Sequence, residues 1–495
     1  MLTPWVVDEM ATADLNDKRL DRRLGKVVSQ FAGNPTASIP AACGGYAETE
    51  AAYRLFNNKK VGFENVLQPH IDATRRRVAE QPVVIAAQDT TELELTRPQQ
   101  QVRGAGPLDR GELRGAFLHV LHAFTPDGTP LGTLGAKEWT RDDAPPPSKE
   151  ERSALRKQTP IEEKESQRWV DMLRQTQAEA RQAAKTHFVC VADSEADIYE
   201  LLAEGQAEPR EADWIVRACQ NRALQGGAKG GDFGDSEGTA AHLREQLLLQ
   251  KVLFTNTINV RGREAKVQCS QRGREQPRAS RTAVVEVRVG RVTLRAPWRP
   301  DRKLPDITVN VVLVREIDPP AGEEPVEWLL LTSLPIDDEE QVRRVIQYYS
   351  VRWMIEVFFR TLKSGCRVEE RMFEELDRLL PCVAVYMIVA WRTLYVCRLG
   401  RACPDVSCEM VFEPAEWKSV YRVVRRRQPP ATPPKLAEMV RMVAQLGGYV
   451  NRKRPDEPGP QTVWLGLQRM HDMALCWQTF GPDTGPEAEL GGKDM

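Results

Sequence analysis

The chain has 495 residues, of which 41% are hydrophobic and 28% charged, with 11 Trp and a net charge of −1. This composition excludes a disordered or uniformly basic protein, and the length suggests about three domains. The basic residues are nevertheless clustered, with 13 Lys and Arg against 4 Asp and Glu in residues 252–303, 7 against 3 in 341–372, and 10 against 1 in 418–454. Separate basic patches on a neutral chain favour a polyanion that is bound at defined places.

The 10 cysteines show no CxxC pair and no paired spacing, which is typical of reduced residues in the cytosol. The N-terminus carries Asp8 and Glu9 and lacks the apolar segment of a signal peptide. The longest apolar run, residues 379–391, contains Pro381 and is too short to span a bilayer. We therefore expect a cytoplasmic protein in which this run is a buried helix.

Residues 1–70 are expected to form a helical module, with apolar positions at near-helical spacing over residues 15–31 and again over 47–57. The hydrophobic period then changes. We expect three antiparallel strands beginning at residues 83, 115 and 130, a helix over 160–185, a strand over 188–192, a helix over 196–203 and a strand from 213. This order predicts a ribonuclease-H-like α/β sheet covered by helices.

Two aspartates follow apolar runs of this sheet, Asp89 after residues 83–87 and Asp193 after residues 188–192. They should lie at the ends of neighbouring strands, where the chemistry of open α/β sheets is usually found. Each could alone be a turn or a helix-capping residue, and Asp193 could cap the helix that begins near Glu195. His119 and His122 are three apart in one strand, point to opposite faces and are expected to be structural.

The α/β pattern is interrupted at about residues 219–325. A Gly-rich loop leads to four strand-like segments that alternate apolar and basic residues, which predicts a half-buried β insertion with Arg on its exposed face. These four segments are residues 252–260, 264–271, 282–296 and 306–314. The strand that contains Trp328 follows. Residues 373–480 are expected to be helical, and residues 481–495 are rich in Gly, Pro and acidic residues and are expected to be disordered.

One long helix is expected over residues 337–363, which contain neither Gly nor Pro and begin with acidic residues. Val351, Ile355, Phe358 and Leu362 form an apolar stripe at helical spacing. The opposite face carries four polar side chains within an arc of roughly 60°, namely Tyr349, Arg352, Glu356 and Lys363. Taken alone, the helix favours the interpretation that this face is a solvated surface on which Arg352 and Glu356 form an ordinary i,i+4 pair.

Asp89, Asp193 and Glu356 would meet at one sheet, and three such carboxylates repel each other unless cations relieve the repulsion. Oxygen ligands of this kind suit Mg²⁺ or Mn²⁺. Two ions about 3.5–4 Å apart can activate an attacking oxygen and stabilise a leaving oxygen at a phosphodiester. Arg352 and Lys363 would then hold phosphate oxygens, and Tyr349 could donate to another phosphate.

The spacing Tyr, two residues, Arg, three, Glu, six, Lys resembles the signature of the DDE transposases of bacterial insertion sequences. It is most similar to the insertion-sequence-four group, which includes the transposon-five transposase. Supporting matches extend from about residue 5 to 478 and include EAAYRLFNN, QDTT, DSEADIY, EWLLLTSLP and LGGYVNRK. The resemblance implies a catalytic triad of Asp89, Asp193 and Glu356. One departure is Ser194, where the family often has a basic residue, which puts a local phosphate contact in doubt.

The resemblance further implies cut-and-paste transposition through end nicking, a DNA hairpin, hairpin opening and strand transfer. Trp328 matches the tryptophan that stacks on the base extruded in the hairpin. The family implies an end-binding module in residues 1–70, a catalytic domain in 71–372 and a dimerisation module in 373–480. The expected partners are double-stranded transposon ends, target DNA and a second copy of the chain in the DNA complex, and the bacterial protein would be nucleoid-associated when bound to DNA.

Two alternatives remain open from the sequence. One is a catalytically silent DNA-binding protein derived from a transposase, although no carboxylate of the triad is missing. The other is a ribonuclease-H-like nuclease that cuts without strand transfer, against which Trp328 and the intact signature argue weakly. The sequence does not give the terminal repeat that is recognised, because base readout depends on side-chain geometry.

Overall fold

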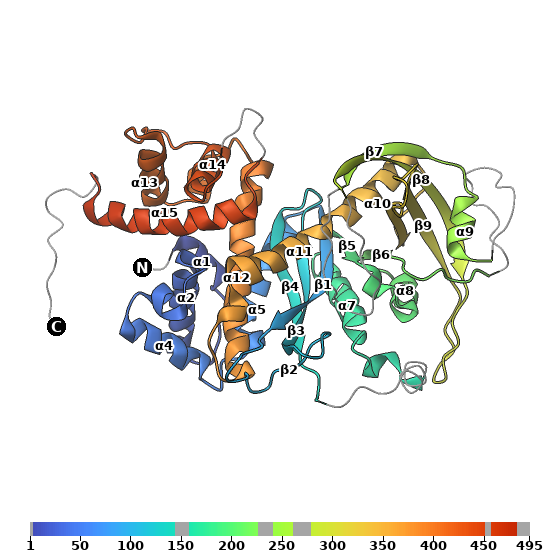
Figure 1. The fold of residues 1–495 in the computed structure, drawn as a ribbon, viewed down its shortest axis with the longest axis horizontal. Helices are drawn as coiled ribbons and strands as arrows, with labels where there is room; N and C mark the ends of the chain where they lie inside the picture. The colour runs from blue at the N-terminus through green and yellow to red at the C-terminus, as the bar shows by residue number, and fades with distance from the viewer. Residues whose placement is uncertain (1–2, 144–157, 226–240, 261–278, 451–456, 483–495) are drawn as a thin grey trace.

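The computed structural model describes residues 3–143, 158–225, 241–260, 279–450 and 457–482 (Figure 1). The expected strand over 264–271, the Gly-rich loop of the insertion and most of the acidic tail lie outside the described residues. The N-terminal part is helical, with α1 (Pro4–Glu9), α2 (Lys18–Gly33), α3 (Ile39–Cys43), α4 (Tyr46–Phe56) and α5 (Phe63–Ala79). These helices agree with the helical module expected for this part of the chain.

The next part of the chain contains the five strands that the sequence predicts and one short strand, β2, that it does not predict. They are β1 (Val83–Glu94), β2 (Gly106–Pro107), β3 (Arg114–Phe124), β4 (Pro130–Trp139), β5 (His187–Ala192) and β6 (Asp213–Arg217). Between and after them lie the helical elements η1 (Ile161–Glu163), α7 (Gln167–Gln182), η2 (Ser194–Ala196) and α8 (Tyr199–Gln206). Strand β1 continues past Asp89 to Glu94, so Asp89 lies within the strand rather than at its end.

The strand order confirms the ribonuclease-H-like expectation. In the part of the chain that the structure describes, the strands form a 10-stranded sheet in the order β2-β3-β1-β5-β6-β10-β9-β8-β7, with β4 paired to β3. Strand β1 is antiparallel to β3 and parallel to β5, and β5 is parallel to β6. The parallel strands β1, β5 and β6 are therefore neighbours at the centre of the sheet, where Gln88, Ala192 and Val216 are level with one another.

The β insertion extends this sheet instead of forming a separate unit. Its elements are α9 (Leu243–Leu248), β7 (Phe254–Val260), β8 (Arg281–Leu294) and β9 (Ile307–Glu316), followed by β10 (Glu327–Thr332). Strand β10 pairs antiparallel with β6 on one side and with β9 on the other. The expected exposed face of Arg over residues 282–296 is present in part, because Arg291 and Arg295 are exposed whereas Arg288 is ion-paired with Glu286.

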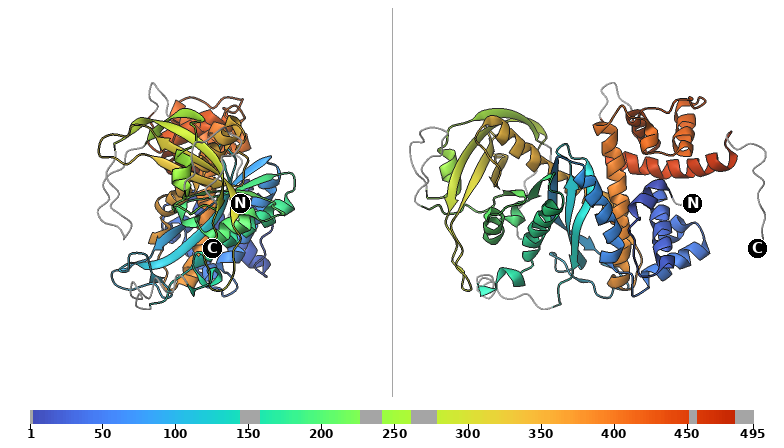
Figure 2. Two further views of the ribbon diagram at one scale, coloured as in Figure 1. Left: turned by 90° about the vertical axis from the view of Figure 1, so that its right-hand side faces the viewer. Right: turned by 180° about the vertical axis from the view of Figure 1, so that it is seen from behind.

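The C-terminal part is helical, as expected. After β10 come α10 (Glu339–Val351), α11 (Trp353–Arg360), η3 (Thr361–Gly365), η4 (Val368–Glu370), α12 (Leu376–Ala402), η5 (Cys408–Met410), α13 (Pro414–Arg425), α14 (Leu436–Leu446) and α15 (Pro460–Phe480). Helix α5 packs on β4, α12 stands between the sheet and the helices α1 to α4, and α13, α14 and α15 gather near the C-terminal end of α12 (Figures 1 and 2).

Helix α12 is the one helix in the described residues that is long and apolar enough to cross a membrane, with 27 residues. In this fold 89% of its most apolar window is buried inside the protein. The helix contains Pro381 close to its start. Its side chains join those of α2, α5 and α10 in one large core, which is the position of a central core helix.

Two cores lie on opposite faces of the central strands. Ile85, Ala87, Val189 and Val191 belong to the core that also contains α10, α11 and α12. Cys190 and Ala192 of β5 belong to the core under α7 and α8. Because side chains alternate along a strand, this division fixes which face each following residue of β1 and β5 occupies.

Candidate active site

The carboxylates Asp89 and Asp193 lie on the face of the sheet that is covered by α11. The pairing of β1 with β5 ends at Gln88 and Ala192, so the next residue on each strand is an aspartate at the same level. Asp89 has the same parity as Ile85 and Ala87, whose side chains pack beneath α10 and α11. The alternation of the strands therefore directs both aspartates toward the helix that carries Glu356.

The helix expected over residues 337–363 is divided at Arg352. The amide of Arg352 donates to Tyr349 O at 3.0 Å, and the amide of Ile355 donates to Arg352 O at 3.1 Å, so the turn is tightened between α10 and α11. The hydroxyl of Ser350 also donates to Ile346 O at 2.8 Å, a contact that bends helices. The apolar stripe of the expected helix is confirmed, since its four side chains are at most 6% exposed.

Arg352 bridges two of the three carboxylates. Its Nη1 lies 3.1 Å from Asp89 Oδ2 and its Nη2 lies 2.6 Å from Glu356 Oε1. The side chains of Arg352 and Asp89 are 13% and 15% exposed, and that of Glu356 is 37% exposed. Arg352 and Glu356 therefore form the expected i,i+4 pair, but the pair is partly buried against the sheet. Arg352 also contacts Asp89 of β1.

The aspartates carry more negative charge than their surroundings balance. Burial, together with the charge of Asp193, raises the pKa of Asp89 to about 7, although Arg352 opposes the shift. Burial also raises the pKa of Asp193, while the amide of Glu195, which donates to Asp193 Oδ1 at 2.8 Å, lowers it. Asp193 thus caps the 3-10 turn η2 and also faces the charge cluster.

The chemistry of this donor set fits a divalent cation, since it consists of hard carboxylate oxygens whose mutual repulsion is incompletely relieved. As the described side chains are placed, no group of three or more His, Cys, Asp or Glu residues closes around a single ion position. The guanidinium of Arg352 lies in contact with both Asp89 and Glu356, and its charge serves the role that a cation would serve between them.

Tyr349 and Trp328 form an aromatic pair beside this cluster. Their ring centroids are 5.2 Å apart with an interplanar angle of 69°, an edge-to-face arrangement. Trp328 is half-buried on β10, where it pairs with Val314 of β9. Burial raises the pKa of Tyr349, and the charge of Arg352 opposes that shift.

Lys363 lies in the short π-helical segment η3 and has partners other than the aspartates. Its Nζ donates to Glu92 O of β1 at 2.8 Å and lies 3.1 Å from Glu369 Oε1. The structure thus brings Asp89, Arg352 and Glu356 into direct contact and places Asp193 within reach of their charges. Lys363 instead contacts β1 three residues beyond Asp89, at Glu92.

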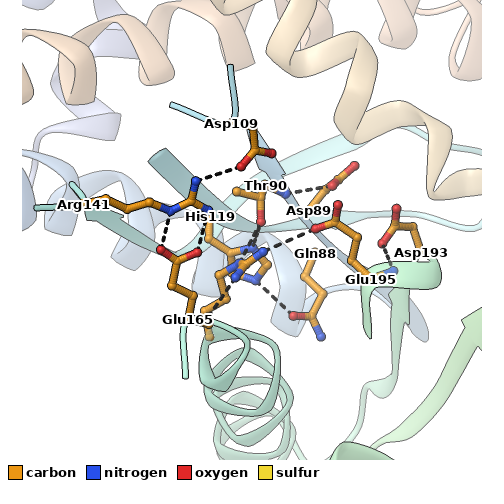
Figure 3. Close-up of polar contacts among 10 residues, drawn as sticks. Gln88, Asp89, Thr90, Asp109, His119, Arg141, Glu165, Asp193 and Glu195 are labelled. Atoms are coloured by element: carbon orange, nitrogen blue, oxygen red, sulfur yellow. Dashed lines mark hydrogen bonds and ion pairs between the residues drawn. The ribbon is translucent and has the colours of Figure 1, made fainter. Parts of the chain in front are cut away.

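Sequence reasoning missed the polar residues that flank the two aspartates. Thr90 donates its amide to Asp89 Oδ1 at 2.7 Å (Figure 3). Arg168 of α7 donates to the Thr90 hydroxyl at 3.0 Å. Arg168 lies in an amphipathic helix whose pattern signals only packing, so no motif pointed to it. The expectation that His119 and His122 are structural and face opposite ways agrees with their contacts, since His119 packs on Trp169 and His122 on Phe358.

Three family models match the chain. The transposase DNA-binding model matches residues 3–61, the transposase DDE domain model matches 157–380, and the transposase Tn5 dimerisation domain model matches 388–476. Asp193 and Glu356 lie inside the DDE match, whereas Asp89 lies in the segment between the first two matches. A solved structure, the cryo-EM structure of the piggyBac transposase synaptic complex with hairpin DNA, is similar with a TM-score of 0.34 and 9% identity, covering 81% of this chain and 72% of that chain.

An α/β DDE domain flanked by a DNA-binding domain and a dimerisation domain defines a metal-dependent DNA transposase. The order of the three matched domains, and the match of the third to the Tn5 dimerisation domain, indicate which group of transposases the chain belongs to. The chain belongs to the DDE transposases of bacterial insertion sequences, and within them to the transposon-five-like members of the insertion-sequence-four group.

Proposed function

We propose that Asp89, Asp193 and Glu356 are the catalytic and metal-binding carboxylates of this transposase. The observation that carries the proposal is their convergence beneath α11, with Asp89 so poorly compensated that its pKa is about 7. Structural carboxylates are usually paired or exposed, whereas functional sites collect uncompensated ones. We propose Mg²⁺ or Mn²⁺ as the cofactor, with two ions per active site.

Bound ions of this kind supply an activated attacking oxygen and stabilise the leaving oxygen at a phosphodiester. The chain's own residues would orient the DNA. Once cations balance Asp89 and Glu356, Arg352 becomes available to donate two parallel hydrogen bonds to a phosphate, the interaction for which a guanidinium is best suited. Tyr349 and Lys363 lie on either side of it along the helix and would contact neighbouring phosphates.

We further propose that transposition proceeds by cut and paste through a DNA hairpin. Each end is nicked by water, the freed 3′-OH attacks the opposite strand, the hairpin is reopened, and the 3′-OH joins target DNA. Trp328 supports this route because its half-buried ring already lies beside Tyr349, where a base that leaves the duplex would find an aromatic partner.

The remaining parts of the chain would hold the DNA and pair the subunits. We propose residues 1–70 as the module that binds transposon ends, 71–372 as the catalytic domain with its insertion at 219–325, and 373–480 as the dimerisation module of a homodimer assembled on two DNA ends. The protein would act in the bacterial cytoplasm on nucleoid DNA, with residues 481–495 as a terminal tail.

The test is a processing assay with the full chain, duplex DNA carrying the element's terminal repeats next to flanking DNA, and Mg²⁺. We expect nicked, hairpin and joined products in sequence from the wild type and none from Asp193→Ala, while both proteins bind the ends. End binding without any cleavage by the wild type would favour a catalytically silent protein. Cleavage with neither hairpin nor joined product would favour a simple nuclease.

A further inference from the structure

The face of β1 opposite Asp89 carries a buried polar network. Gln88 and Thr90 alternate with Asp89 and therefore point toward β3 and α7. His119 of β3, which is completely buried, places its Nδ1 2.8 Å from Thr90 Oγ1 and its Nε2 3.2 Å from Gln88 Oε1. The Gln88 amide reaches Cys190 Sγ of β5 at 3.2 Å. This network links β3, β1 and β5 on the face opposite Asp89, and Figure 3 shows its members Gln88, Thr90 and His119.

Arg168 of α7 joins this network to the segment that follows Asp193. Its Nε donates to Thr90 Oγ1 at 3.0 Å, and its Nη2 lies 3.3 Å from Glu195 Oε2. Its Nη1 donates to the backbone oxygen of Glu165 at 2.8 Å, which anchors the guanidinium to the start of its own helix. The Arg168 side chain is only 12% exposed.

Both residues that Arg168 holds are themselves bonded to an aspartate. The amide of Thr90 donates to Asp89 Oδ1 at 2.7 Å, and the amide of Glu195 donates to Asp193 Oδ1 at 2.8 Å. One guanidinium thus fixes the side chains of two residues whose amides orient the two carboxylates. The planar guanidinium makes these three contacts from separate nitrogens in a fixed geometry, which distinguishes Arg from the single ammonium nitrogen of Lys at this position.

We propose that Arg168 is a positioning residue that sets the separation and orientation of Asp89 and Asp193 for metal binding. This inference rests on the proposed function, in which the two aspartates are metal ligands. Residues that orient the ligands of a metal commonly matter about 10–100-fold for metal affinity or activity when they are changed. Arg168 acts through Thr90 and Glu195 and has no direct contact with either carboxylate among the hydrogen bonds of the described residues.

The surroundings of Arg168 disfavour a direct role in binding DNA phosphate. The side chain borders a cavity of about 1010 Å³. The other arginines that line this cavity are each paired with a carboxylate, in the pairs Arg141–Glu165, Arg222–Asp197 and Arg299–Glu200. A cavity whose arginines are already balanced by acids offers little attraction to a polyanion.

The test is Mn²⁺ binding by the full chain without DNA, followed by the electron paramagnetic resonance signal of free Mn²⁺. We expect Arg168→Gln to weaken Mn²⁺ binding about tenfold or more. Loss of a positive charge would by itself strengthen the binding of a cation, so a weaker affinity points to lost positioning. Arg168→Lys keeps the positive charge but lacks the planar guanidinium, so it should also bind Mn²⁺ more weakly than the wild type.

Arg174→Gln is the matched control, because Arg174 lies on the same helix and forms a more exposed ion pair with Glu204. It should bind Mn²⁺ like the wild type, and all variants should bind terminal-repeat DNA equally well in EDTA. If Arg168→Gln fails to fold, Thr90→Val removes the hydroxyl that Arg168 holds with little change of shape and should give the same loss.

The outcomes separate this inference from the proposed function. Wild-type Mn²⁺ affinity in Arg168→Gln or in Thr90→Val overturns the positioning role, even if cleavage of DNA is lost. If Mn²⁺ binding by the wild type is unaffected by Asp193→Asn, the proposed metal site itself is wrong, and the inference falls with it. Weakened binding in Asp193→Asn, Arg168→Gln and Thr90→Val, with Arg174→Gln unaffected, supports both.

Discussion

Replacing Asp89 by Asn should stabilise the protein in EDTA, because the buried carboxylate destabilises the fold when it is ionised. Its pKa rises from the ordinary value of 3.8 to about 7 in the folded protein. Between these values the folded state retains a proton that the unfolded state has lost, so stability falls as the pH increases and the loss is complete above pH 7. A shift of about 3 units corresponds to an upper limit of about 4 kcal/mol.

Asn cannot ionise, so the stability of Asp89→Asn should lack this component of the pH dependence. Above pH 7 we expect the variant to exceed the wild type by about 2–4 kcal/mol, and the difference should shrink steadily as the pH is lowered toward 4. At about 2 °C per kcal/mol for a large domain, the midpoint of thermal unfolding should rise by about 4–8 °C at pH 8.

The assay is thermal unfolding by circular dichroism at several pH values in EDTA. Glu94→Gln is the control, because Glu94 lies on the same strand with an exposed side chain and should change the midpoint little. An Asp89→Asn variant that is less stable than the wild type at pH 8, or one whose advantage does not change with pH, would refute the reasoning that the charge of Asp89 is poorly compensated.

Three further predictions concern the metal site, the hydrophobic core and Trp328. Saturating Mn²⁺ should raise the midpoint of the wild type, by an amount that corresponds to about 2.7 kcal/mol at 100 times the dissociation constant, and Asp193→Asn should abolish that increase in a calorimetric scan. Phe358→Ala should cost about 3–5 kcal/mol in denaturant unfolding because Phe358 is completely buried, whereas Phe480→Ala, at 83% exposure, should change stability by less than about 0.5 kcal/mol. Trp328→Ala should still nick transposon ends but accumulate far less hairpin on a denaturing gel; wild-type hairpin yield would remove the stacking role.

The sequence predicted the central sheet and the proximity of its carboxylates well, because both depend on local patterns. A buried strand is visible in the sequence as a short apolar run. Because side chains alternate along a strand, the pattern that puts Ile85 and Ala87 in the core also determines the face on which Asp89 lies. The apolar stripe of the signature helix was equally visible, since burial of Ile355 and Phe358 follows from helical spacing alone.

Features that depend on tertiary contacts could not be predicted in the same way. The division of the helix at Arg352 is accompanied by two tightened backbone hydrogen bonds, and the sequence, which lacks Gly and Pro there, offers only Ser350 as a sign of it. In the β insertion, Arg291 and Arg295 are exposed as the strand pattern predicts, whereas Arg288 donates to the backbone oxygen of Leu248 at 3.1 Å, a contact that the pattern does not show. Arg168 carries no motif, and its importance emerges only when α7 is packed against β1.

The charged residues of the signature illustrate a second limit. The spacing of Arg352 and Lys363 put both side chains on one face of the expected helix, where both were expected to hold phosphate oxygens. In the structure the two side chains have different partners. Arg352 contacts Asp89 and Glu356, while Lys363 contacts Glu92 and Glu369. Their binding to phosphate therefore requires that both side chains exchange protein partners for DNA, which a sequence pattern cannot reveal.

The central claim is that Asp89, Asp193 and Glu356 bind a divalent cation together, and iron-mediated cleavage of the polypeptide tests it most directly. Fe²⁺ that replaces Mg²⁺ in the presence of ascorbate cuts the backbone close to its site. We expect cuts near residues 89, 193 and 356, all suppressed by excess Mg²⁺ and absent from Asp193→Asn. Cuts confined to other segments, or cuts near these residues that persist in Asp193→Asn, would contradict it.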